Sequence, residues 1–208
     1  RGHDRYNQVK AGDSSARVGE WEKVPSDELF AAIHKETDKT RIVAEDLGII
    51  DDGVRELLKK TGYPGMRVLS FAFNGESGNP YLPENVEENS VCYTATHDND
   101  TLKGLIEGFS EWDKNNLVNG VKNSLRIAEI NEKTDTTEDL INAILRLGFN
   151  CKSKLFVAPI QDLLSLGSDY RINEPGTVKP QNWAVKFGRG QIDGAADKLK
   201  KLTAEYKR

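Results

Sequence analysis

Hydrophobic residues along this chain fall into short runs that alternate with longer amphipathic stretches. The runs have the length and the β-branched or aromatic content of buried strands. They cover residues 42–45, 66–73, 91–96 and 155–160. The stretches between and around them have the 3.6-residue spacing of helices, at residues 26–34, 51–62, 102–148 and 193–208. Strands that alternate with helices favour right-handed βαβ units and a parallel sheet.

Start and stop signals support three of these helices. Ser26 is expected to be the N-cap of the first. The second begins with acids at Asp51 and ends with lysines before Gly62, as the helix dipole favours. Within residues 102–148, a start signal lies at Asp135, and Gly148 is expected to close the helix that follows it. Its apolar stripe consists of Ile141, Ile144, Leu145 and Leu147.

Three segments read as loops, because glycine, proline and asparagine stand among polar residues without a period. They are residues 1–25, 74–89 and 167–190. In the first, Trp21 is an isolated apolar residue and is interpreted as an anchor. The second follows the end of a predicted strand, so it suits a loop that borders a site.

Polar and acidic residues follow two of the predicted strands directly. The run 91–96 changes abruptly into His97, Asp98, Asn99 and Asp100, and the run 42–44 is followed by Glu45 and Asp46. In an α/β barrel the catalytic groups lie at the carboxyl ends of the strands. The two segments are therefore candidates for the rim of an active site.

Composition excludes several classes of protein. The chain has 208 residues, 29 of them basic and 33 acidic, and both signs are interspersed, so no nucleic-acid partner and no polybasic membrane surface is expected. The longest apolar runs are much shorter than the stretch of about 18 residues that indicates a membrane-spanning helix.

We expect a cytoplasmic location. Cys92 and Cys151 have no partner at metal-ligand spacing, and both are expected to be reduced thiols.

Carboxylates at separate strand ends suit glycosyl transfer, in which one acid protonates the leaving oxygen and others attack or stabilise the oxocarbenium-like carbon. The competing interpretation is that these acids only cap helices or turns. His97 has no second histidine or cysteine at ligand spacing, so a hydrogen-bonding role is expected and no metal site is predicted. Aromatic residues that are candidates for stacking on a sugar are Phe71, Phe73, Tyr81, Trp112 and Trp183, the first two expected on one face of a strand.

Six segments together resemble one family, the 4-α-glucanotransferases called amylomaltase or disproportionating enzyme. They occur in order over nearly the whole chain. The segments are Ala44-Glu-Asp-Leu-Gly48, Gly62-Tyr-Pro-Gly-Met66, Asn79-Pro-Tyr-Leu-Pro83, Tyr93-Thr-Ala-Thr-His-Asp-Asn-Asp-Thr101, Pro159-Ile-Gln-Asp-Leu-Leu164 and Asn173-Glu-Pro-Gly-Thr177. The resemblance implies an α/β fold, a (β/α)8 TIM barrel. This chain would form its second half, strands 5 to 8 with their helices, as one catalytic region over residues 1–208 without a separate second domain.

The resemblance also implies the chemistry. Glu45 matches the family's general acid/base and Asp98 its transition-state stabiliser. Substrate-contacting positions match His97, Asn173, Asp46 and Phe73. The implied reaction moves α-1,4-glucan segments between maltooligosaccharides, or to glucose as acceptor, with retention and without a cofactor. Its setting would be maltodextrin, starch or glycogen metabolism.

The family's nucleophile lies in an Arg-x-Asp-His segment just before an Arg-Gly pair that matches Arg1 and Gly2. The chain alone is therefore expected to lack the covalent step and the N-terminal half of the barrel, its missing partner. Two alternatives stay open. One is a non-catalytic, carbohydrate-binding half-barrel remnant, and the other is an α-glucan hydrolase that uses water as acceptor.

Overall fold

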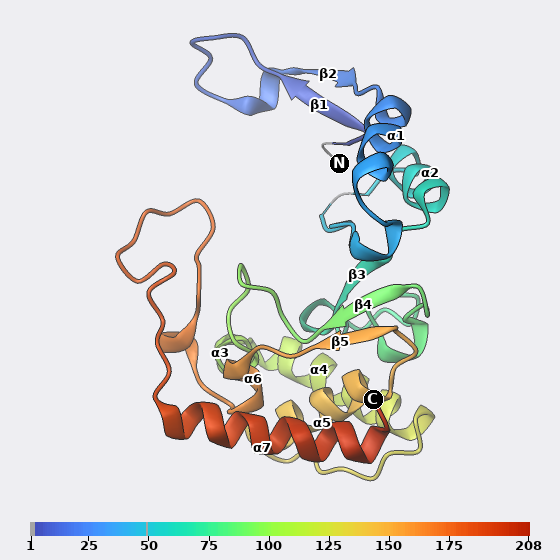
Figure 1. Cartoon of the computed structure of the whole chain (residues 1–208). Coiled ribbons are helices and arrows are strands. Elements are labelled where there is room, and N and C mark those ends of the chain that lie inside the picture. The colour runs from blue at the N-terminus through green and yellow to red at the C-terminus, as the bar shows by residue number, and fades with distance from the viewer. Residues whose placement is uncertain (1–2, 49) are drawn as a thin grey trace. The chain divides into compact units, whose positions relative to one another are not determined.

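The computed structural model describes residues 3–48 and 50–208. The chain divides into two compact units, Arg1–Met66 and Arg67–Arg208. The first unit contains a hairpin and two helices. The second contains most of a small sheet and the remaining helices (Figure 1).

The elements are short and follow one another closely. The strands are β1 (Arg5–Gln8), β2 (Glu20–Lys23), β3 (Gly65–Val68), β4 (Ser90–Tyr93) and β5 (Leu155–Val157). The α-helices are α1 (Ser26–Glu36), α2 (Asp52–Thr61), α3 (Leu102–Gly108), α4 (Glu111–Ile127), α5 (Thr137–Asn150), α6 (Ile160–Leu163) and α7 (Arg189–Tyr206). Short 3-10 turns are η1 (Ala16–Val18), η2 (Lys39–Arg41), η3 (Leu69–Phe71), η4 (Pro83–Asn85) and η5 (Ser168–Tyr170).

The prediction of a loop over residues 1–25 was wrong. This segment contains an antiparallel hairpin in which Arg5 pairs with Lys23 and Gln8 with Glu20. Both strands carry polar residues on both faces, so the alternation that marks a half-buried strand is absent from the sequence. Trp21 lies on β2 with 53% of its surface exposed, so its interpretation as an anchor was also wrong.

The helix ends of the first unit follow local hydrogen bonding. Pro25, not Ser26, is the N-cap of α1, and the hydroxyl of Ser26 donates instead to the carbonyl oxygens of His3 and Val24. At α2 the prediction was correct. The carboxylate of Asp51 accepts from the amide of Val54, and Gly62 ends the helix with a φ of 71°, a left-handed conformation that glycine adopts without strain.

Residues 42–45 do not form the predicted strand. Their contact with a neighbouring segment is the bond from the amide of Ala44 to the carbonyl oxygen of Pro64, at 2.9 Å. A strand requires a ladder of such bonds along a neighbour, and none is assigned to this segment in the part of the chain that the structure describes. An apolar run can indicate a strand, but it does not provide the neighbour.

The other predicted strands form one three-stranded sheet in the order β3-β4-β5. Strands β4 and β5 run parallel, with Val91 opposite Leu155 and Tyr93 opposite Val157. The chain between them forms α3, α4 and α5, so the predicted βαβ connection is confirmed here. Strand β3 ends at Val68, earlier than predicted, because the η3 turn follows.

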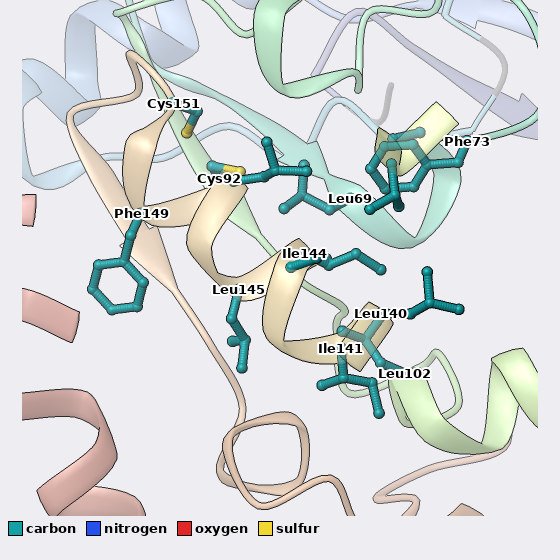
Figure 2. Packing of buried hydrophobic residues seen from close by; sticks show 14 of the residues in the cluster. Leu69, Phe73, Cys92, Leu102, Leu140, Ile141, Ile144, Leu145, Phe149 and Cys151 are labelled. Atoms are coloured by element: carbon teal, nitrogen blue, oxygen red, sulfur yellow. The ribbon is translucent and has the colours of Figure 1, made fainter. Parts of the chain in front are cut away.

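Helix α5 is the centre of the hydrophobic core in the second unit. The predicted stripe is confirmed, since each of its members is essentially fully buried. Further residues of α5, among them Ala143 and Phe149, are buried as well, so the helix is enclosed on more sides than one stripe suggests. Figure 2 shows Ile141 of α5 beside Leu102 of α3, and Ile144 and Leu145 belong to the same cluster.

Gly148 does not end α5, contrary to the prediction. The helix begins after Thr136, which forms a capping box with Asp139, and continues to Asn150. A Cβ atom at Gly148 would lie 2.3 Å from the ring of Phe156 on β5. Glycine at this position therefore permits close packing between helix and strand.

We expect Gly148→Ala to lower the free energy of unfolding by about 1–3 kcal/mol, because the added methyl group overlaps the Phe156 ring. Gly194→Ala in α7 is the matched control, since the nearest atom to its new Cβ lies 3.8 Å away. The control is expected to be neutral or to gain up to about 1 kcal/mol from helix propensity. Urea denaturation of both variants measures the difference, and equal effects would contradict the packing argument.

Candidate functional site

Residues 94–101 connect β4 to α3 and carry His97 and Asp98. Both ends of this segment are fixed by one buried carboxylate, that of Asp162 on α6. The hydroxyl of Thr94 donates to its Oδ2 at 2.5 Å, and the amide of Leu102 donates to its Oδ1 at 2.8 Å. The segment is therefore a loop closed at its base.

Burial raises the pKa of Asp162, because the charged form loses water, while the bonds from Thr94 and Leu102 act in the opposite direction. The carboxylate of Asp100 nearby raises the pKa further. Thus Asp162 holds the loop at a cost in free energy when it is ionised.

Hydrogen bonds within the loop set its shape. The side-chain oxygen of Asn99 accepts from the amide of Thr96 at 2.9 Å and from its hydroxyl at 2.8 Å. The same hydroxyl oxygen accepts from the amide of Asp98 at 3.3 Å. Side chains that bond to their own backbone in this way fix tight turns. His97 and Asp98 lie on the exposed side of this turn.

A second segment, after η5, meets the loop at Asp98. The side-chain amide of Asn173 donates to Asp98 Oδ1 at 2.7 Å, and its backbone amide donates to the carbonyl oxygen of His97 at 3.2 Å. Arg171 donates to the carbonyl oxygens of Asp98 and Asn173, each at 2.8 Å. His97 Nε2 lies 3.3 Å from Asp98 Oδ1. The structure thus brings together three of the residues predicted from the sequence: His97, Asp98 and Asn173.

Arg171 is a site residue that the sequence reasoning missed. The sequence feature that could have identified it is its position two residues before Asn173. This spacing places both side chains on one side of an extended segment. One guanidinium holds both segments at their backbone oxygens, so it fixes their relative positions.

Glu45 and Asp46 lie in the first unit and have different surroundings. Glu45 is exposed and lies on the lining of a pocket of about 310 Å³. The rest of that lining is mainly apolar and includes Phe30, Ile33, Leu57, Leu58 and Tyr63. Asp46 is buried, and its Oδ1 accepts from the amide of Met66 at 2.6 Å. Exposed and less exposed residues alternate over 41–46, so anchoring Asp46 inward turns Glu45 outward.

Asp46 and Phe73, the other two predicted substrate contacts, are both buried in the structure. The Asp46 carboxylate is committed to the start of β3, where a Cβ at Gly65 would lie 2.5 Å from Oδ2. Phe73 is 8% exposed and belongs to the core. Because η3 follows β3, Phe71 and Phe73 do not share a strand face as predicted. Phe71 is 42% exposed, so it is the better placed of the two for a ligand.

Two further observations concern residues 3–48 and 50–208. No group of three or more histidine, cysteine, aspartate or glutamate residues in these ranges is placed to hold a metal ion. No helix in the same ranges has both the length and the apolar character needed to cross a membrane.

Helices packed on a parallel sheet, with an acid and a histidine at the carboxyl end of a strand, are features of barrel-type enzymes. The chain belongs to the 4-alpha-glucanotransferase family, whose model matches residues 1–190. The resemblance seen in the sequence is therefore confirmed.

Relatives in this family come from bacteria and plants. Over 209 residues the chain is 36% identical to the 4-alpha-glucanotransferase of Clostridium butyricum, a match that covers 100% of this chain and 41% of that protein. It is 35% identical to the chloroplastic/amyloplastic 4-alpha-glucanotransferase of Solanum tuberosum, a match that covers 100% of this chain and 35% of that protein. The chain thus spans about two fifths of the length of these relatives.

Solved structures agree with the sequence relatives. Amylomaltase from Streptococcus agalactiae in complex with acarbose matches with a TM-score of 0.85 and 30% identity, over 100% of this chain and 40% of that one. Amylomaltase from Corynebacterium glutamicum matches with a TM-score of 0.73 over 97% of this chain and 34% of that one, and at 17% identity it supports the fold alone. The chain therefore has the fold of part of an amylomaltase. Its parallel sheet has three strands in the order β3-β4-β5.

We expect Asp162→Ala to lower the free energy of unfolding by about 2–5 kcal/mol, because it leaves the Leu102 amide and the Thr94 hydroxyl without their acceptor. Asp162→Asn keeps an acceptor and is expected to cost less. Since the pKa of Asp162 is raised in the folded state, the folded chain binds more protons than the unfolded chain between that pKa and the ordinary value near 3.9. The stability of the unsubstituted chain relative to Asp162→Asn should therefore rise as the pH falls from 7 through this range.

Urea denaturation at a series of pH values checks this expectation. Asp169→Asn, at an exposed carboxylate of the same unit, is the control for the loss of a surface charge. A difference between Asp162→Asn and the unsubstituted chain that stays constant with pH would contradict the raised pKa.

Proposed function

We propose that this chain is the part of a 4-α-glucanotransferase that carries its general acid/base and its transition-state stabiliser. The reaction transfers α-1,4-glucan segments between maltooligosaccharides, or to glucose, with retention and without a cofactor. The observation that supports this most is the grouping of Asp98, His97 and Asn173 beyond the end of β4, in a chain of this family. The acarbose in the Streptococcus agalactiae amylomaltase complex supports an oligosaccharide ligand.

In the first step a carboxylate nucleophile bonds to the anomeric carbon of the donor glucan, and the glycosidic C–O bond breaks. Glu45 gives its proton to the departing oxygen, which becomes the 4-hydroxyl of the released piece. In the second step the 4-hydroxyl of an acceptor attacks the same carbon, the ester to the nucleophile breaks, and Glu45 takes up the acceptor's proton. The nucleophile and Glu45 both return to their starting states.

Asp98 faces the positive charge that develops on the sugar ring during both steps. Its carboxylate is held by Asn173, and its backbone by Arg171, before substrate binds. A charge that is already oriented stabilises the transition state without reorganisation at the moment of reaction. His97 and Asn173 bind sugar hydroxyls in this proposal, and Asp46 positions Glu45 through its bond to Met66.

The nucleophile in this proposal comes from residues outside this chain, together with the other half of the barrel. The relatives support this, because the chain matches only 35–41% of their length. The chain would then supply the second half of the barrel, and alone it would be inactive. The potato relative, named chloroplastic/amyloplastic, supports a role in starch metabolism. The cytoplasmic location stays a prediction of the sequence.

The test uses the protein from the complete reading frame, assayed with maltotriose. We expect Glu45→Gln and Asp98→Asn each to lower turnover by about 10²–10⁴-fold, the range for a positioned acid or charge, with little change in the binding of maltoheptaose. Glu56→Gln, at an exposed carboxylate on α2, is the control and should retain full turnover. Unchanged turnover in Glu45→Gln would overturn the assignment.

The same assay separates the alternatives. A transferase exchanges glucan segments and keeps the number of reducing ends constant, whereas a hydrolase increases that number with each turnover. Binding of maltoheptaose without either reaction would favour the carbohydrate-binding remnant.

A further inference from the structure

Trp183 has a backbone conformation that few tryptophans adopt. Its φ is 61°, in the left-handed region, where a bulky side chain is strained. Such strain persists only where the surrounding structure fixes it. An unfavourable conformation held in place is an observation that points to function.

Hydrogen bonds on both sides of Trp183 maintain this conformation. Its amide donates to the carbonyl oxygen of Ile172 at 2.7 Å, which ties it to the segment that carries Asn173. The side chain of Asn182 accepts from the amide of Glu174 at 3.3 Å and donates to Thr177. The amide of Ala184 donates to the carbonyl oxygen of Gln181 at 3.1 Å.

The indole lies beside the candidate site, on its exposed side. The ring centres of Trp183 and His97 are 5.0 Å apart with an angle of 40° between the planes. Even so, 66% of Trp183 is exposed, so His97 covers only part of the indole. A large exposed aromatic surface therefore adjoins the carboxylate of Asp98, which lies 3.3 Å from the His97 ring.

From this geometry we propose that Trp183 is a saccharide-binding residue whose indole stacks on the apolar face of a glucose ring next to the ring bound at Asp98. The proposal rests on the proposed function, and it adds a subsite and the residue that forms it. The C–H groups of a pyranose face match an aromatic surface, while the adjacent Asp98, His97 and Asn173 supply the polar groups that fix orientation. The strained backbone is then the cost of presenting the indole to the ligand.

Trp112 provides a matched comparison in the same unit. It is on α4 and is 68% exposed, almost as much as Trp183. Its position is helical, without a positive φ. Exposure alone therefore does not distinguish Trp183, but the strain and the contact with His97 do.

The experiment compares variants of the complete protein by steady-state kinetics with maltotriose, thermal unfolding and tryptophan fluorescence. We expect Trp183→Ala and Trp183→Gly to raise KM about tenfold, with kcat within about twofold, because the lost contact is a binding contact. Trp183→Phe keeps an aromatic face and should raise KM less than about threefold. Trp112→Ala should leave both constants unchanged.

Stability separates this role from a structural one. Glycine adopts a φ of 61° without strain, so Trp183→Gly is expected to unfold at the same temperature as the parent protein or higher. If Trp183 were instead a structural anchor, Trp183→Gly would unfold at a lower temperature than the parent protein, with KM unchanged. That result would overturn the inference. Addition of maltoheptaose should change the tryptophan emission of the parent protein and of Trp112→Phe, but change that of Trp183→Phe much less.

The proposed function and this inference can fail separately. If the parent protein neither transfers glucan segments nor binds maltoheptaose, the proposed function is overturned and the subsite with it. If the parent protein is active and Trp183→Ala has the parent KM and the parent fluorescence response, the inference alone is overturned.

Discussion

The site in the second unit depends on one buried carboxylate, that of Asp162, which fixes both ends of the loop carrying Asp98. One of its oxygens accepts from Thr94 just after β4, and the other accepts from the amide that opens α3 at Leu102. The carboxylate comes from α6, directly after β5. The loop between the two contacts is therefore defined by the neighbouring strand's continuation and not by its own sequence alone.

Burial of the Asp162 carboxylate lowers the stability of the fold but fixes the position of the loop. A carboxylate taken out of water is unfavourable when ionised, and two neutral hydrogen bonds recover only part of that free energy. The ionised carboxylate accepts stronger hydrogen bonds from the amide and the hydroxyl than a neutral acceptor would. On the exposed side of the loop, Arg171 donates to the backbone carbonyl oxygen of Asp98, and Asn173 donates to its carboxylate. Asp98 is therefore fixed by contacts with two segments.

The sequence predicted those parts of the structure that depend on local periodicity. The strands β4 and β5, the helix α2 and the buried stripe of α5 follow from spacing and from end signals. The hairpin of residues 5–23 has polar residues on both faces and carries no such signal. The run at 42–45 has the signal, but among the described residues no ladder is assigned to it. In the site, the strand end identified His97 and Asp98, whereas Asn173 came from the resemblance. The roles of Arg171 and Trp183 follow from contacts between distant segments, which periodicity does not encode.

The segment that carries Glu45 and the segment that carries Asp98 have the same arrangement of acidic residues. In each, an exposed acid has a neighbouring acid that is tied to the protein. Asp46 accepts from the amide of Met66 beside exposed Glu45, and Asp100 accepts from the amide of Thr101 and the hydroxyl of Ser168, each at 2.8 Å, beside exposed Asp98. An acid that must meet a substrate cannot itself be anchored by strong hydrogen bonds on all sides, because those bonds would compete with the substrate. Anchoring the neighbour instead fixes the backbone and leaves the reactive side chain accessible, which is the requirement for preorganisation of a site.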